Sequence, residues 1–331
     1  MNKKLTIFAV ALIVIGTVGT ISSSISAVPF LTNYINEYVN KAREEVKIYE
    51  KKVDVSKLDI ETNNTNVEVK KSNSDKLKIT QIGNFNDNAY TIDNKDNTLS
   101  IKEEDRPINM EVQSFGDALI KKMNLGENKI VIYVPNNVDI QVSTKGGELI
   151  LKDKSILQKQ LFFNTEYGQI VLPKEIKNLE NLTISSNGSI NLKSSEILGI
   201  KNINISTTSD VYLQSMPDDV FIENVENFIP DSFNIIATRY AGTINIESSI
   251  PVAKKLNIDN KNGITYLNLP TDYYNTEFNL NASQNINFED ENYKNKEPMK
   301  KFNGSLKQHK ENEFKYNVDA KSQEINIGIN K

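Results

Sequence analysis

The chain has 331 residues, a formal net charge of −4, 38% hydrophobic residues and 25% charged residues, a balance typical of an ordered globular chain. This charge excludes a dedicated nucleic-acid-binding protein, because phosphate neutralisation needs clustered lysine and arginine. The chain has no cysteine and one histidine, His309, in a polar run. A disulfide framework and a thiol nucleophile are therefore excluded, zinc and serine–histidine chemistry are disfavoured, and we expect no cofactor.

The N-terminus predicts a membrane anchor within residues 1–31. Lys3 and Lys4 precede an uncharged stretch, 5–25, whose helix would be about 32 Å long and would cross a hydrocarbon core of about 30 Å. Residues 5–25 are thus the expected contact with the membrane. The short N-terminal side predicts a single-pass protein of the cell membrane, with its N-terminus inside and its C-terminal domain outside the cytoplasm. Small residues at 22–27 leave a cleaved signal peptide, and hence a secreted protein, as the alternative.

Residues 32–54 predict a juxtamembrane stalk helix. Apolar side chains recur at helical spacing from Ile35 through Tyr38, Ala42 and Val46 to Tyr49. Such a helix would either pack on the following domain or pair with a partner.

Residues 55–135 predict an N-terminal β region with a helical insertion. Short segments alternate apolar and polar residues, as half-buried strands do, and the polar residues 93–97 predict a hairpin turn. Residues 110–125 instead place apolar side chains at helical spacing, which predicts an amphipathic helix that caps the domain. Contact of this helix with a membrane, helped by Lys121 and Lys122, is the alternative. The predicted strands include 58–60, 67–69, 77–79, 90–92, 99–101 and 130–135.

Residues 136–331 repeat a strand–turn–strand pattern about every 20 residues. Segments that begin at Gly147, Gly168 and Gly188 each place a glycine before alternating apolar residues, and a polar turn and another alternating strand precede each one. One such unit cannot bury its apolar face alone, so the copies must stack. The pattern predicts an all-β fold of the β-solenoid type. Further copies begin near residues 209, 242, 264 and 285.

Alternation within the repeats assigns the inward and outward side chains. Ile184 and Ile190 are predicted to point inward, and Thr183 and Asn191 outward. The chain has 45 asparagines, and outward asparagines on stacked strands would lie about 4.8 Å apart, close enough to hydrogen-bond along the stack. We expect Asn204, Asn234, Asn257 and Asn279 to share one row, and Asn245, Asn268 and Asn287 another.

Two segments interrupt the repeats. Residues 214–232 lengthen one repeat to 33 residues, which predicts an excursion loop. Residues 289–313 are charged and loop-like, and the strands 314–318 and 324–327 are expected to form the C-terminal rung or cap.

Four segments, 58–61, 66–69, 97–101 and 130–135, combine with the glycine-led repeats into a recognisable pattern. Together they resemble the bacterial putative-adhesin β-strand-repeat family, also called the toast-rack type, found in membrane-anchored envelope proteins of Gram-positive bacteria. The resemblance covers about residues 55–330. The chain departs from it at the excursion loop and at Ser209 and Asp210, where a turn glycine is expected. The resemblance implies a surface-exposed β-solenoid without shared catalytic residues, with members near envelope stress-response systems.

A carbohydrate lyase or hydrolase is the alternative function, because parallel β-helices host such chemistry with clustered carboxylates, a calcium ion and a basic residue. The candidate residues are Asp210, Asp218, Asp219 and Arg239. Asp218 and Asp219 are expected in a solvated acidic loop, and Arg239 is one of only three arginines. We therefore assign no catalytic, cofactor-binding or metal-binding residue and favour a non-enzyme.

The leading hypothesis is a membrane-anchored surface protein that offers an interaction face to another envelope or membrane protein. Most outward repeat positions are polar, but Ile150, Phe162, Val171 and Tyr212 place apolar or aromatic groups there. Such a patch needs a cover. Either the excursion loop or the N-terminal strands pack over it, or it binds a partner protein. The sequence does not separate adhesion from envelope-stress sensing.

Overall fold

The computed structural model describes residues 44–83, 89–104, 128–215, 225–238, 242–290, 298–306 and 315–329. The chain divides into two compact units, and the second, made of Lys47–Gln81, Asn86–Asp105 and Asn128–Lys331, contains nearly all of these residues. The account below concerns this second unit. The predicted anchor 1–31 and cap helix 110–125 lie outside the described residues. Within the described ranges, no helix is both long enough and apolar enough to span a membrane.

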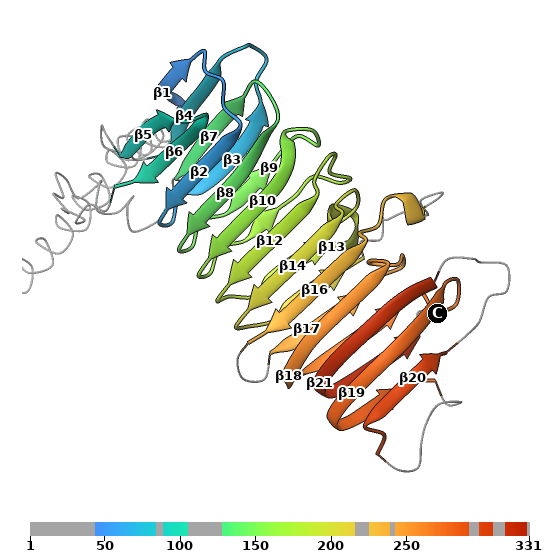
Figure 1. Ribbon diagram of the computed structural model, residues 1–331. Helices are drawn as coiled ribbons and strands as arrows, with labels where there is room; N and C mark the ends of the chain where they lie inside the picture. Colours follow the sequence, from blue (N-terminus) through green and yellow to red (C-terminus); the bar gives the residue numbers. More distant parts are fainter. Residues whose placement is uncertain are drawn as a thin grey trace, which may run out of the picture. The chain divides into compact units, whose positions relative to one another are not determined.

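The predicted repeats stack as rungs arranged in two columns, and most neighbouring strands in a column run parallel (Figure 1). In spatial order, the first column contains β6 (Thr98–Glu103), β2 (Lys57–Thr62), β8 (Val138–Thr144), β10 (Leu157–Thr165), β12 (Asn181–Ser186), β14 (Asn202–Thr207) and β16 (Ser232–Ala237). The second column contains β4 (Leu77–Ile82), β7 (Lys129–Val134), β3 (Asn66–Lys71), β9 (Leu149–Leu151), β11 (Ile170–Val171), β13 (Ile190–Lys193), β15 (Val211–Gln214) and β17 (Thr243–Glu247).

Three long strands complete both columns. They are β18 (Lys255–Leu269), β21 (Lys315–Ile329) and β19 (Asn275–Phe288). The first half of β18 pairs with β16 and its second half with β17, so one strand spans a whole rung. Three shorter strands lie at the ends: β20 (Lys301–Ser305) runs antiparallel to β19, β5 (Tyr90–Lys95) runs antiparallel to β6, and β1 (Val46–Lys51) lies beside β4.

Alternating apolar residues of both columns fill one shared core. Leu182 and Ile184 of β12 and Ile190 and Leu192 of β13 are buried in the same cluster. Asn191, between the last two, is exposed. The predicted inward and outward assignment of this rung is confirmed. Because the columns share one core, their outward side chains face opposite directions.

At both ends, the rungs do not follow chain order. The rung of β2 and β3 lies between the rung of β6 and β7 and the rung of β8 and β9, and its pairings are parallel on both sides. At the other end, β21 lies between β18 and β19, parallel to both. The predicted N-terminal β region 55–135 therefore contributes rungs to the same columns, and the predicted C-terminal strands form an internal rung.

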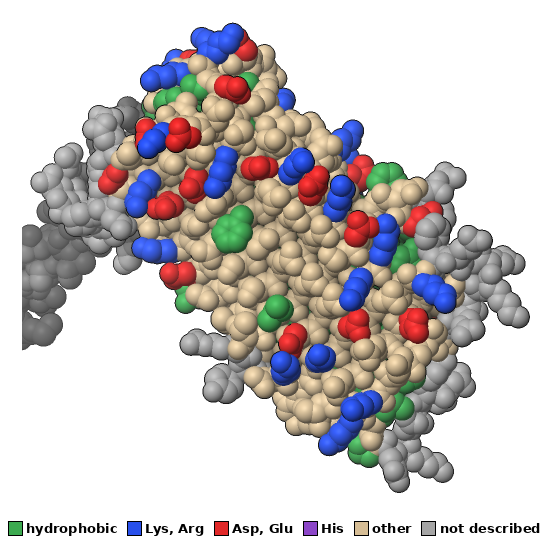
Figure 2. All heavy atoms as spheres, viewed as in Figure 1, with side chains coloured by type: hydrophobic (Ala, Val, Ile, Leu, Met, Phe, Trp, Pro, Cys, Tyr) green, Lys and Arg blue, Asp and Glu red, His purple; other side chains and the backbone are tan. Residues whose placement is uncertain are grey.

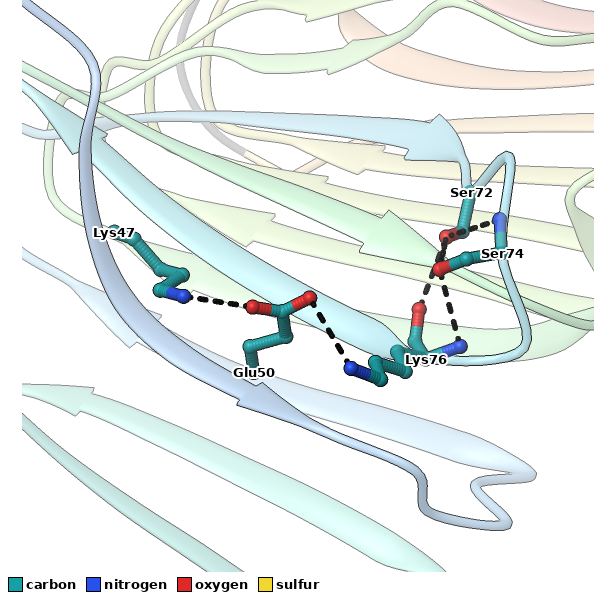
Figure 3. Close-up of polar contacts among 5 residues, drawn as sticks. All are labelled: Lys47, Glu50, Ser72, Ser74 and Lys76. Carbon is teal, nitrogen blue, oxygen red and sulfur yellow. Dashed lines mark hydrogen bonds and ion pairs between the residues drawn. The ribbon is translucent and has the colours of Figure 1, made fainter.

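The stalk-helix prediction is wrong over the part that the structure describes, because residues 46–51 form strand β1. In this strand Glu50 pairs with Lys47 at 2.8 Å and with Lys76 at 3.8 Å (Figure 3). The turn before β4 is closed separately by Ser72, whose hydroxyl donates to the carbonyl oxygen of Lys76 at 2.9 Å. Exposed ion pairs of this kind stabilise little. The apolar residues of this short segment, Val46, Ile48 and Tyr49, are compatible with both a helical and a strand period.

The excursion segment 214–232 is described at 214–215 and 225–232, and the second of these ranges contains the short 3-10 helix η2 (Val225–Asn227). Val225 and Ile229 are buried in a small cluster with Leu198, Ile250 and Tyr316. The end of this segment therefore packs on the stack near the other short 3-10 helix, η1 (Ser194–Glu196).

Asparagine rows form on the first column as predicted, with one change. The Asn234 amide donates to Asn204 at 2.9 Å and accepts from Asn257 at 2.6 Å. Because β21 is inserted, Asp319 and not Asn279 lies next to Asn257, and Asn279 donates to Asp319 at 2.6 Å. These asparagines therefore serve the rung-to-rung contacts.

The second predicted row is wrong at one position. Asn245 is level with Tyr266, whereas Asn268 is level with Glu247 and Gly328. The shift arises because Thr265 takes the inward position opposite Ile244. Its buried hydroxyl lies 2.6 Å from that of Ser322.

The register predicts unequal effects of two neighbouring substitutions. Ile190→Asp would place an unpaired carboxylate at a site that is 3% exposed, and we expect a loss of several kcal/mol in the free energy of unfolding. Asn191→Asp, on the outer face, should lose far less. Chemical denaturation of both variants checks this, and equal losses would contradict the register.

Tight stacking also predicts that Gly168 cannot accept a side chain. A Cβ atom there would lie 2.1 Å from the carbonyl oxygen of Gly147, the same turn one rung away. We expect Gly168→Ala to lower the free energy of unfolding by about 1–3 kcal/mol through overpacking. The control is Gly146→Ala, where the close atom is the movable side-chain oxygen of Asn64. A control as damaging as Gly168→Ala would count against rung spacing as the cause.

Candidate binding surfaces

The four predicted patch residues do not form one surface. Phe162 lies on the first column, between Gln141 and Thr183. Ile150, Val171 and Tyr212 lie on the second column, which faces away from the first. The four residues therefore occupy two opposite faces.

Phe162 stands in a polar surface. It is 36% exposed, and its neighbours in the adjacent strands, Gln141 and Thr183, are polar. Figure 2 shows the face over β8 to β16, where hydrophobic side chains stand singly among polar ones. A single exposed aromatic residue of this kind is ordinary for a protein surface.

The second column instead presents two runs of outward residues, from Glu68 to Val171 and from Asn191 to Asn287, which together we call the outer row. In the register of adjacent strands, Ile150 lies opposite Glu68 on one side and Val171 on the other. Tyr212 lies between Asn191 and Asn245 in the same way. Tyr266 lies between Asn245 and Asn326. Val171 is 39% exposed and Tyr266 is 43% exposed. The outer row consists of Glu68, Ile150, Val171, Asn191, Tyr212, Asn245, Tyr266, Asn326 and Asn287.

Side chains link the outer row where β11 meets β13. The amide of Gln169 donates to the carbonyl oxygen of Ser189 at 2.9 Å and accepts from Asn191 at 3.3 Å. These bonds join the two rungs at the point where the six-stranded sheet ends. Val171 and Tyr212 therefore belong to one supported surface.

At one end of the outer row, Glu68 is buried between two lysines. Its carboxylate lies 2.8 Å from the Lys70 ammonium and 3.0 Å from that of Lys129. Burial alone would raise the pKa of Glu68, but the two lysines outweigh it and hold the pKa below its usual value. This end of the row is therefore fixed by buried charge.

At the other end, Tyr266 borders a shallow hollow of about 330 Å³. Acceptor oxygens converge on its floor at Gly328, where a Cβ atom would lie 3.3 Å from Oε2 of Glu289 and 3.4 Å from Oδ1 of Asn268. The Asn268 oxygen is buried without a hydrogen-bond partner among the described residues. The hollow is lined by Thr243, Asn245, Glu247, Tyr266, Leu267, Asn268, Glu289, Asn326 and Gly328.

Asn326 is held in place beside the hollow. Its Oδ1 accepts from the amide of Asn287 at 2.8 Å, and the same amide donates to Glu324 at 2.9 Å. This wall of the hollow is thus preformed.

The aromatic residue of this hollow was missed by the sequence interpretation, which aligned Asn268 with Asn245 and left Tyr266 out of the row. The signal lay in the alternation of residues 264–269, where both Tyr266 and Asn268 are outward. Only the pairing of Ile244 with Thr265 decides which one continues the row.

A larger hollow of about 500 Å³ lies at the turn-side ends of β2, β8, β10 and β12. Two of its charged side chains are engaged within the chain. Glu103 accepts from the backbone of Asn63 at 2.7 Å and from the Thr65 hydroxyl at 3.0 Å. Lys102 pairs with Glu61 at 3.1 Å. These contacts serve the turns between the columns.

The enzyme candidates do not assemble into a described active site. Asp210 accepts a hydrogen bond from the backbone nitrogen of Thr243 at 2.6 Å, so its carboxylate joins two rungs where a turn glycine was expected. Asp218, Asp219 and Arg239 lie outside the described residues. In the described ranges, no group of three acidic or histidine side chains could hold a metal ion.

The two ion pairs of Glu68 predict a pH-dependent contribution to the free energy of unfolding. Because the folded pKa is lowered, the contribution is present above the pKa of the unfolded carboxyl group and is lost as pH falls through the folded pKa. Glu68→Gln should lower the free energy of unfolding by about 1–3 kcal/mol at pH 7, and by less near pH 3. Denaturation across this range, with the exposed Glu166→Gln as control, measures it. A deficit that does not change with pH would refute the role of charge.

Three comparisons with known proteins bear on the chain. No match was found among curated proteins. A solved structure described as a putative adhesin from Bacteroides fragilis is 11% identical, with a TM-score of 0.39, over 87% of this chain and 98% of that one. A putative cell adhesion protein from Clostridium sporogenes is also 11% identical, with a TM-score of 0.19, over 87% of this chain and 100% of that one. The model of the Toastrack DUF4097 family, whose description names no enzymatic activity, matches residues 55–328, and the chain belongs to this family.

Proposed function

We propose that the chain is a non-enzymatic surface protein, anchored in the cell membrane through residues 5–25, that presents the outer row to a partner in the cell envelope. The observation that carries the proposal is the row itself. Val171 and Tyr266 are exposed on a column of supported strands. Exposed apolar groups aligned on a rigid surface are typical of an interaction site.

The surroundings of Asp210 and Glu68 do not favour a catalytic role for these two carboxylates. The carboxylate of Asp210 is engaged with the backbone, and Glu68 is neutralised by two lysines. A general acid or base needs a carboxyl group free to exchange a proton with a substrate. Neither carboxylate meets this requirement.

The N-terminal sequence supports display outside the cytoplasm. The apolar stretch 5–25 is long enough for one span, and the stack follows it in the chain. An anchored stack would hold the outer row near the membrane, within reach of envelope or membrane proteins. Adhesion and stress sensing would both use this face.

Site-specific photocrosslinking on intact cells tests the proposal. A photoreactive residue in place of Val171 or Tyr212 should capture an envelope component, whereas the same residue in place of Asn204, exposed on the opposite column, should capture much less. Protease added to protoplasts should remove the stack and leave the anchor in the membrane. Equal crosslinking from both columns would contradict the proposed face, and full protection from protease would contradict the topology.

A further inference from the structure

We propose that the hollow beside Tyr266 binds an uncharged oligosaccharide. The inference rests on the proposed function, because it names a ligand class for one end of the outer row. Three features of the hollow carry it: an exposed aromatic ring, a carboxylate oxygen beside Gly328, and the lack of a basic residue among the described residues that line it.

The first feature is the aromatic ring of Tyr266. Tyr266 is 43% exposed and lies between Asn245 and Asn326 in the neighbouring strands. A sugar ring has one face of C–H groups that packs on an aromatic face, as apolar groups do. Tyr212 lies in the same row two strands away, roughly 10 Å along the column. A β-1,4-linked sugar advances by about one strand spacing, so the two tyrosines match alternate sugars of one chain.

The polar groups then fit sugar hydroxyls. Oε2 of Glu289, an exposed residue, lies beside the space that Gly328 leaves open. A hydroxyl group can donate to this oxygen and accept from an amide such as that of Asn245. A glycine at this position lets a ligand approach the sheet, since any side chain would occupy the floor.

The charge of the lining selects among sugars. Glu247 and Glu289 are its charged residues, and none of the nine lining residues is basic. Two carboxylates repel an anionic polymer such as a polyuronate. They accept hydrogen bonds from a neutral sugar. A protein partner that binds the apolar residues Ile150 and Val171 of the outer row would not need this hollow.

Calorimetry on the full-length chain in nanodiscs free of glycolipid tests the inference. The probes are cellohexaose and chitohexaose, which are neutral, and hexagalacturonic acid, which is anionic; empty nanodiscs give the background. We expect saturable binding of at least one neutral hexasaccharide and none of the anionic one. Tyr266→Ala should weaken this binding about tenfold or more, through loss of ring packing. Gly328→Val should abolish it by filling the floor, while its β-branched side chain suits a strand.

The matched control is Tyr167→Ala, which removes a tyrosine that is 70% exposed outside the hollow and should leave binding unchanged. Melting curves of all variants should coincide with that of the parent chain. Absence of binding to both neutral probes, preference for the anionic one, or binding unaffected by Tyr266→Ala and Gly328→Val would overturn the inference. If crosslinking from Val171 and Tyr212 persisted in that case, only the sugar assignment would fail and the proposed function would stand.

Discussion

Each rung of this protein can bury its apolar residues only against the next rung. A strand–turn–strand unit of about 20 residues exposes one apolar face, and stacking in two columns closes that face into a shared core. The spacing between parallel strands then fixes what every other position can hold. At Gly168 the neighbouring turn comes too close for a Cβ atom. At Asn234 the same spacing lets one amide bond to two others.

Alternation within a repeat could be predicted from the sequence, but the order of the rungs could not. The inward position of Ile190 and the outward position of Asn191 followed from period-two patterning alone. The placing of β2 and β21 inside the stack did not, because the pairing partners of a strand are set by contacts far away in the chain. The alignment near Tyr266 failed for a related reason: Thr265 is polar but buried, since Ser322 of the inserted strand lies beside its hydroxyl.

The two columns use their outward positions differently. On the first column, asparagine follows asparagine and the amides satisfy one another, so little remains for a ligand. On the second, Tyr212 and Tyr266 interrupt the amide sequence. Asn245 lies between the two tyrosines and has no amide beside it in either neighbouring strand. The asparagine ladder of the first column is therefore not repeated at this point of the second.

The insertion of β21 also determines how the C-terminal end of the stack would respond to mechanical load. In a simple solenoid the last strand of the chain is an edge strand, and tension peels it off one hydrogen bond at a time. Here β21, the last described strand, has parallel partners on both sides. Force that enters through this end must therefore slide β21 past two ladders at once, with the bonds loaded together in shear. The first described strand, β1, lies at a sheet edge beside β4, so tension on that side would peel it off, and the two ends of the stack would differ in mechanical resistance.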